Sequence, residues 1–215
     1  MNRITSHPAF PFVSPFAVFL AFLSIEGWHE AAIYLVYPIK TLAVFMLLLY
    51  LWRRFPTICF PNAWQSVGIG VVVFVLWVGA GPFLALGELK AVFKPFLFED
   101  QNVAWGLVIV RIFGASLVVP VMEELFWRGF LMRYLIQDRF EEIELGTYRP
   151  FSFWATTCCF AAVHGPFAPV AFITGIVYGF WFVKTRSLGN VMLAHGVTNL
   201  LLGIYVVHTG KWFFW

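Results

Sequence analysis

The chain has 215 residues, of which 61 % are hydrophobic and 12 % are charged. Soluble domains carry about 25 % charged residues, so this chain has too few charges to cover a water-facing surface. The composition excludes a disordered regulator, a nucleic-acid binder and a disulfide-stapled secreted module. It indicates a polytopic membrane protein. The net charge of +3 requires no anionic partner, because an excess of Lys and Arg is what orients a protein in a bilayer.

Seven apolar segments follow one another along the chain. Because about 20 apolar residues cross the hydrocarbon core of a bilayer, we predict an all-α, polytopic transmembrane bundle of about seven to eight helices. Residues 1–215 are expected to form a single integral-membrane domain, with the motif-bearing core at 104–208. The lack of an internal sequence repeat argues against an inverted-repeat transporter. The predicted spans are 10–25, 31–52, 67–87, 104–135, 151–165, 168–184 and 190–208.

The basic residues predict the orientation of the bundle. With a cytoplasmic N-terminus, the cytoplasmic segments contain eight of the fourteen Lys and Arg residues, namely Arg3, Arg53, Arg54, Arg133, Arg139, Arg149, Lys184 and Arg186. The opposite segments contain Lys90, Lys94 and Lys211, and the apolar spans contain Lys40, Arg111 and Arg128. This bias favours a cytoplasmic N-terminus, in a protein of the bacterial inner (cytoplasmic) membrane. A further helix between Glu88 and Asn102 would invert everything that follows it.

Two adjacent glutamates lie within the fourth apolar span. A charged side chain at membrane depth raises the free energy of membrane insertion by about 2.5–3.5 kcal/mol, so we expect each glutamate to have an ion-pair partner or a functional role. Glu124 and Arg128 are four residues apart and are expected to form an ion pair on one helix face. Glu123 points about 100° away on the helix and lacks this partner. It is therefore our candidate for a general base or acid.

Two histidines and an asparagine lie in later apolar spans. His164 directly precedes the Gly165-Pro166 break, whereas His195 and Asn199 are four residues apart and share one helix face. A carboxylate and an imidazole can hold a water molecule and take its proton. An imidazole beside a carboxamide can donate hydrogen bonds to a developing oxyanion. Together these groups could hydrolyse an amide without a covalent nucleophile.

In sequence order these residues form the patterns Glu-Glu-x-x-x-Arg, Phe-x-x-x-His and His-x-x-x-Asn, between about Leu107 and Leu202. This arrangement resembles the three motifs of the CAAX prenyl protease and bacteriocin-processing family, also called the Abi or type II CAAX endopeptidase family. The resemblance implies that Glu123 and His164 activate water and that His195 and Asn199 stabilise the oxyanion. Glu124 and Arg128 would support them.

The resemblance also implies an intramembrane endopeptidase that cuts near the terminus of a membrane-associated protein or peptide. No cofactor is expected, and the partners are the substrate, with or without a lipid anchor, and the bilayer. The short length and the segment from Gly203 to Trp215 look like the bacterial branch associated with exosortase protein-sorting systems. Oligomeric state, substrate and cleavage position stay open.

The proposed site makes a structural demand on two of the spans. Glu123 and His164 can share a water molecule only if the fourth span is long or tilted and runs through Arg128 to about Tyr134. The fifth span must be short and broken at Gly165-Pro166. Such a break at membrane depth is tolerated where it lines a cavity.

Two other functions are compatible with the same residues. Two histidines and a carboxylate can bind zinc, which would make the chain a zinc-dependent membrane protease, although it contains no His-Glu-x-x-His helix. Alternatively, the polar cluster could bind rather than cut, as in a non-catalytic accessory or immunity protein of a protein-sorting system. Glu124 and Arg128 could then be a purely structural ion pair. Lys40 and Arg111 lack a motif and are expected to be structural.

Overall fold

The computed structural model describes residues 3–26, 28–29 and 31–215. In these ranges all regular structure is helical, and no strand occurs. The α-helices are α1 (Arg3–Ser6), α2 (Phe10–Glu26), α3 (Ala32–Leu51), α4 (Ala63–Leu84), α5 (Gln101–Phe113), α6 (Val119–Glu124), α7 (Met132–Tyr134), α8 (Pro150–Ala162), α9 (Ala168–Thr185) and α10 (Leu188–Thr209). The π-helical segments are η3 (Gly114–Val118) and η4 (Leu125–Leu131), and the 3-10 turns are η1 (Trp52–Arg54), η2 (Pro95–Leu97), η5 (Phe140–Glu142), η6 (Gly165–Phe167) and η7 (Trp212–Phe214).

Five helical stretches of the described chain are long and apolar enough to cross a membrane. They are Ala32–Arg54, Ala63–Leu84, Gln101–Tyr134, Gly165–Thr185 and Leu188–Thr209, and Phe10–Glu26 is a shorter apolar helix. The predicted all-α membrane fold is therefore confirmed. Between Glu88 and Asn102 the only helical element is the three-residue turn η2, which is too short to cross and does not invert the predicted topology.

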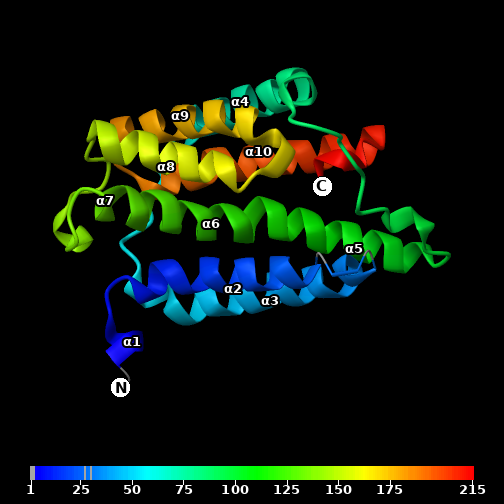
Figure 1. Ribbon diagram of the computed structural model, residues 1–215, viewed down its shortest axis with the longest axis horizontal. Coiled ribbons are helices and arrows are strands. Elements are labelled where there is room, and N and C mark those ends of the chain that lie inside the picture. Colours follow the sequence, from blue (N-terminus) through cyan, green and yellow to red (C-terminus); the bar gives the residue numbers. More distant parts are fainter. Residues whose placement is uncertain (1–2, 27, 30) are drawn as a thin grey trace.

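The helices form three layers (Figure 1). The pair α2 and α3 forms one outer layer, and the stretch from α5 to α7 runs through the middle. The hairpin of α8 and α9 lies on the other side together with α4 and α10. The middle layer is thus in contact with both outer layers, which places residues on its different faces in different surroundings.

The middle layer is a single helical rod of 34 residues, Gln101–Tyr134. At 1.5 Å per residue it is about 50 Å long, which exceeds the hydrocarbon core of a bilayer. The π-helical segments η3 and η4 directly precede and follow α6, which carries both glutamates. Each π turn includes an extra residue and changes the direction of the side chains beyond it. The long fourth span that the site requires is confirmed.

The hairpin of α8 and α9 is shorter than its neighbours. Helix α8 has 13 residues, which span about 20 Å and cannot cross the bilayer. The chain then turns back at Gly165 and Pro166 in η6 and returns through α9. This is the short, broken fifth span that the site requires.

Helices α4 and α10 approach each other closely at Gly70. A Cβ atom at this position would lie 2.5 Å from the backbone oxygen of Ala194. Thr198 uses the close approach, since its hydroxyl donates to the Gly70 carbonyl at 2.8 Å. Small residues at helix contacts are typical of membrane bundles, and here they fix the face of α10 that also carries His195.

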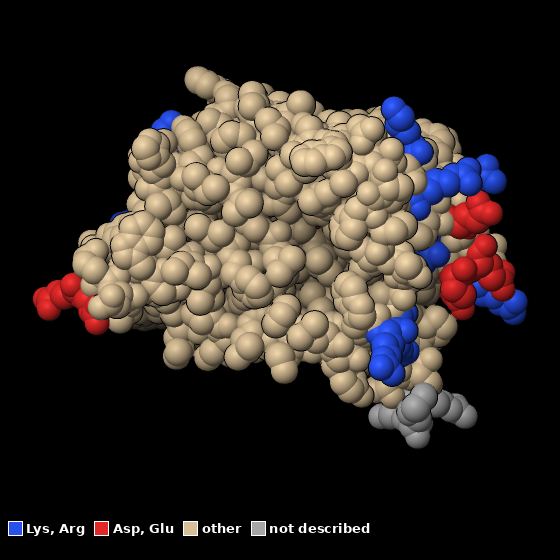
Figure 2. Space-filling model, turned by 180° about the vertical axis from the view of Figure 1, so that it is seen from behind, with Lys and Arg blue, Asp and Glu red and all other residues tan. Residues whose placement is uncertain are grey.

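Charged side chains gather at the two ends of the molecule, and a broad middle zone of the face in Figure 2 carries none. This distribution is what a protein embedded in a bilayer requires, because charges are costly at membrane depth. The charged residues in the middle of the rod include Glu123, Glu124 and Arg128, and these three are buried inside the bundle.

Candidate active site

A cavity of about 170 Å³ lies between the rod, the α8–α9 hairpin, α4 and α10. All four residues predicted to act directly on a substrate line it, namely Glu123, His164, His195 and Asn199. They come from three separate stretches of the chain: α6, the turn after α8, and two successive turns of α10. The remaining walls are mostly apolar and include Trp77, Phe160, Tyr178 and Leu202.

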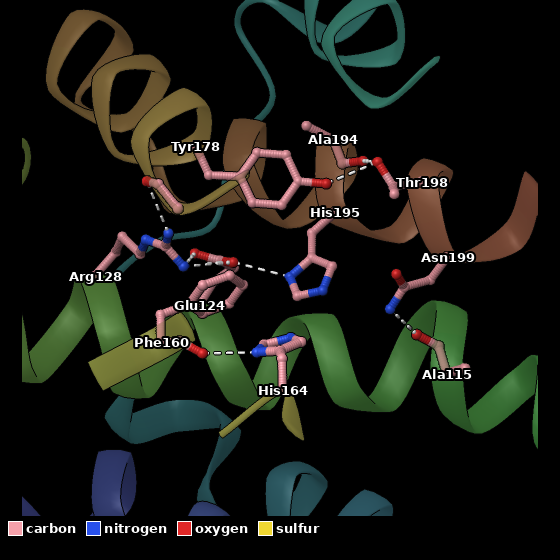
Figure 3. A network of polar contacts seen from close by, with 11 residues as sticks. Ala115, Glu124, Arg128, Phe160, His164, Tyr178, Ala194, His195, Thr198 and Asn199 are labelled. Carbon is pink, nitrogen blue, oxygen red and sulfur yellow. Dashed lines mark hydrogen bonds and ion pairs between the residues drawn. The ribbon is translucent and has the colours of Figure 1, made fainter. Parts of the chain in front are cut away.

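Glu124 lies behind this cavity and binds two partners (Figure 3). Nη1 of Arg128 lies 3.0 Å from both of its carboxylate oxygens, which confirms the predicted ion pair. Nδ1 of His195 lies 2.9 Å from Oε1 of the same carboxylate. Glu124 is 0 % exposed and Arg128 1 %. The guanidinium also donates to the Gly175 carbonyl at 3.4 Å and covers the ring of Phe160 at 4.8 Å.

Glu123 has no such partner. Its side chain is 7 % exposed and lines the cavity. Among the described residues, no group makes a hydrogen bond to its buried Oε2 atom. The difference from Glu124 follows from the helix, since neighbouring residues point about 100° apart. One carboxylate is thus neutralised inside the protein, and the other faces the cavity.

The imidazole of His164 has a fixed tautomer. Helix α8 ends at Ala162, so its last carbonyl groups lack helical donors. Nδ1 of His164 lies 2.6 Å from the carbonyl oxygen of Phe160 and donates to it. Because a carbonyl can only accept, the proton lies on Nδ1 and Nε2 keeps a free lone pair.

Asn199 is positioned by a local defect in the rod. In η3 the backbone N–H of Val119 bonds to Gly114, five residues earlier. In this register the donor for the Ala115 carbonyl would be residue 120, which is a proline without an N–H. Nδ2 of Asn199 supplies the missing donor at 2.8 Å (Figure 3). One amide hydrogen of Asn199 is therefore bound to the rod, and its second remains available.

His195 is held between Glu124 and a chain of hydroxyl groups. The Tyr178 hydroxyl donates to Thr198 at 2.7 Å, one turn after His195 on α10, and the rings of Tyr178 and His195 lie 5.3 Å apart. Phe160 belongs to the Phe-x-x-x-His pattern of the sequence, whereas Tyr178 and Thr198 were not predicted to be part of the site. The only sequence signal for Thr198 was its spacing from His195, because residues three apart on a helix lie on the same face.

The two remaining charged residues within the spans are structural, as predicted. Lys40 forms an ion pair with Glu26 at 2.9 Å. The Arg111 guanidinium lies over the rings of Tyr37 and Phe93 at 4.6 and 4.7 Å. Neither lines the cavity.

The donor groups do not form a metal-binding cluster in the described part of the chain. No group of three or more His, Cys, Asp and Glu side chains is placed to hold a metal ion. Although Glu123, His164 and His195 line one cavity, they do not converge on a common point. A metal ion is not needed to satisfy Nδ1 of either histidine, since each has an acceptor within the protein.

Fold and site together define an all-helical, polytopic membrane protein with a polar cavity inside its helices. Residues 104–201 match the family model of the type II CAAX prenyl endopeptidases, Rce1-like, so this part of the chain is similar to that family. The match covers all three motifs and confirms the resemblance on which the site was first predicted. The comparisons with curated proteins and with solved structures gave no match.

Proposed function

We propose that the protein is an intramembrane endopeptidase that hydrolyses a peptide bond near the terminus of a membrane-associated substrate. The family match supports a protease of the membrane interior. The observation that carries the mechanism is the unpartnered carboxylate of Glu123 in one cavity with His164, His195 and Asn199.

In the proposed reaction Glu123 is the general base. A water molecule between Glu123 and Nε2 of His164 gives one proton to the carboxylate and is oriented by the imidazole lone pair. Its oxygen attacks the carbonyl carbon of the substrate. When the tetrahedral intermediate collapses, the C–N bond breaks and Glu123 returns the proton to the leaving amine. Water is thus divided between a new carboxylic acid, which keeps the oxygen and one proton, and a new amine, which takes the other proton.

The oxyanion requires hydrogen-bond donors at the opposite wall. Asn199 offers its second amide hydrogen. His195 can donate from Nε2 when the ring carries two protons, because its Nδ1–H is occupied by Glu124. In this state Glu124 binds two cations, Arg128 and His195, and the charges of these three groups and Glu123 sum to zero. The reaction then moves a negative charge from Glu123 to the oxyanion within a preorganised site, which is how such sites lower a barrier.

We propose that this chemistry requires no cofactor. A zinc-dependent reaction is the alternative, and incubation with a chelator separates the two. Under our proposal the hydrolysis rate is unchanged by chelation, and elemental analysis of the active protein finds no stoichiometric metal. Loss of activity on chelation, with recovery on adding zinc, would establish the alternative.

We further propose a substrate in a bacterial protein-sorting system of the exosortase type, in line with the predicted location in the inner membrane. Two quenched fluorescent peptides distinguish the recognised chemistry. One carries an S-farnesyl cysteine near its terminus, and the other replaces this residue by an apolar side chain. Preference for the second peptide would assign the protein to substrates without a prenyl group.

The test of the mechanism uses the protein in proteoliposomes with these two peptides. Glu123→Gln should lower the hydrolysis rate by about 10²-fold or more, with an unchanged thermal unfolding midpoint. The matched control is Glu141→Gln, since Glu141 is exposed and far from the cavity. In H₂¹⁸O the new carboxylate should gain one ¹⁸O atom. Full activity of Glu123→Gln would refute the assignment. A biological effect that survives Glu123→Ala and His195→Ala together would indicate a binding protein instead.

A further inference from the structure

The helices leave the catalytic cavity open at one end. Helix α10 has 22 residues, whereas α9, which runs beside it from the same end, has 18, so α9 stops about 6 Å short of the end of α10. Figure 1 shows the turn of the α8–α9 hairpin ending before α10 and α5 do. At the other end, the fully buried Glu124 and Arg128 close the cavity. A substrate therefore has an approach above the hairpin turn.

Residues 211–215 cover this opening, and we call them the aromatic cap. Phe214 and Trp215 both line the catalytic cavity. The ring of Phe214 stacks on Phe167 of the hairpin turn, with centroids 5.3 Å apart. The ring of Trp215 lies 5.4 Å from the Arg111 guanidinium on the rod. The cap thus bridges the hairpin and the rod across the mouth of the cavity.

The cap is attached by ring contacts, by the hydrogen bond from Lys211 Nζ to the Tyr205 hydroxyl at 2.7 Å, and by its covalent connection to α10. In the described structure its backbone hydrogen bonds all stay within residues 210–215, as from Trp212 to Gly210 and from Trp215 to Trp212. Gly210 ends α10 with a left-handed conformation at φ +70°, and no atom lies within 4 Å of its virtual Cβ. The four residues Trp212–Trp215 are only half-buried. Such a segment can swing about Gly210 without breaking a backbone hydrogen bond to the bundle.

The capped end lies opposite the arginine-rich end of the molecule. The same end as the cap carries the loop 85–100, where the Leu86 N–H bonds to the Pro166 carbonyl of the hairpin turn at 2.8 Å. The basic residues at positions 53, 54, 133, 139, 149 and 186 lie at or just beyond the other ends of the helices. Since an excess of Lys and Arg marks the cytoplasmic side, the cap faces the extracytoplasmic side.

We propose that the aromatic cap is a gate, and that the substrate is a membrane-anchored peptide that enters from the extracytoplasmic side by displacing Phe214 and Trp215. This inference rests on the proposed function for the identity of the substrate. The gate itself can be measured without hydrolysis, so the two proposals can fail separately.

The test measures how fast a thiol in the cavity reacts. Cys59, Cys158 and Cys159 are exposed and are first replaced by Ser, and Ala115, which lines the cavity, is then replaced by Cys. A small, charged, membrane-impermeant thiosulfonate is added either to spheroplasts or to inverted membrane vesicles. The cap variant is Phe214→Ala with Trp215→Ala. The matched control is Trp105→Ala, because Trp105 is a half-exposed tryptophan at the same end that does not line the cavity.

We expect slow labelling with the native cap and labelling about tenfold faster in the cap variant, because the aromatic contacts that hold the gate are lost. The fast reaction should occur in spheroplasts and not in inverted vesicles. Trp105→Ala should react like the native protein, and the ring-preserving variant Phe214→Tyr with Trp215→Phe should stay slow. Equal rates with and without the cap would overturn the gate. Labelling from the arginine-rich side alone would overturn the proposed entry route. Labelling of the cap variant from both sides would indicate that the substitutions disrupt the bundle. The variant Phe214→Tyr with Trp215→Phe tests this, because a bundle that is intact should remain slow to label from either side.

Discussion

Nδ1 of His195 lies 2.9 Å from Oε1 of Glu124, so the two adjacent glutamates have different environments. Glu124 binds Arg128 and His195 behind the cavity wall, whereas Glu123 faces the cavity. A residue on the rod thereby orients an imidazole on α10. The Arg128–Glu124–His195 contact is the link between the first and the third motif.

Breaking this link should destabilise the protein. Glu124→Gln leaves the buried Arg128 guanidinium without a counter-charge, and removal of one partner of a buried pair costs about 3–5 kcal/mol. The unfolding free energy of the detergent-solubilised protein measures this loss. Arg128→Met combined with Glu124→Gln should cost less than the sum of the two single changes.

The control for this cycle is the exposed pair of Arg139 and Glu142, with an N–O distance of 3.4 Å. Glu142→Gln should change the unfolding free energy by less than about 1 kcal/mol. If Glu124→Gln were as mild as Glu142→Gln, the buried pair would not have the structural role assigned to it.

The hydrogen bond from Asn199 to the Ala115 carbonyl allows the structural contribution of Asn199 to be measured apart from its catalytic contribution. Asn199→Ala should lose about 1 kcal/mol of unfolding free energy, because the part-buried Ala115 carbonyl is left without its donor. It should also lower kcat by about 10²-fold through the lost oxyanion donor. Pro120→Ala in addition restores a backbone N–H at residue 120 that can bond to Ala115.

The double variant should therefore recover stability and not activity. Thermal unfolding and peptide hydrolysis measured on the same preparations decide this. Recovery of both properties would mean that Asn199 acts only by holding the rod, and recovery of neither would contradict the register argument for Pro120.

The contact of α4 with α10 should not tolerate a side chain at Gly70. A Cβ atom there would lie 2.5 Å from the Ala194 oxygen and 2.8 Å from Cβ of Val197, so Gly70→Val must separate the helices. We expect a loss of about 1–3 kcal/mol, as for overpacking in a core, together with a lower hydrolysis rate because Thr198 and His195 shift with α10. Gly79→Val on the same helix is the control, since nothing lies within 4 Å of its virtual Cβ. Equal unfolding midpoints for the two variants would contradict this account.

The sequence predicted the long rod, the short hairpin and the four cavity residues because each has a local signal. Charged residues at membrane depth are costly, and the i, i+4 spacing assigns them to faces. The pairing of Glu124 with Arg128 follows from this spacing alone. The spans agree with the observed helices because mean hydropathy and helix breaks such as Gly165-Pro166 set their ends.

Contacts between distant segments could not be predicted in the same way. The bond from Glu124 to His195 joins residues 71 positions apart, and no pattern in one sequence connects them. The two π-helical segments also left no readable signal, although they decide that Ala115 needs Asn199 as a donor. The segment from Gly203 to Trp215 was noted only for its likeness to the bacterial branch, because the position of the cap over the cavity depends on how far the hairpin reaches.

The separation of Glu124 and His195 along the chain has a consequence for biogenesis. When the rod leaves the ribosome, α9 and α10 have not been synthesised, and Glu123, Glu124 and Arg128 must enter the translocon with only part of their final surroundings. The ion pair within the rod offsets two of these charges at once, while Glu123 meets His164 only after α8 is made and its remaining polar neighbours only when α10 follows. The rod is therefore expected to wait at the translocon and to be released into lipid together with the last two helices.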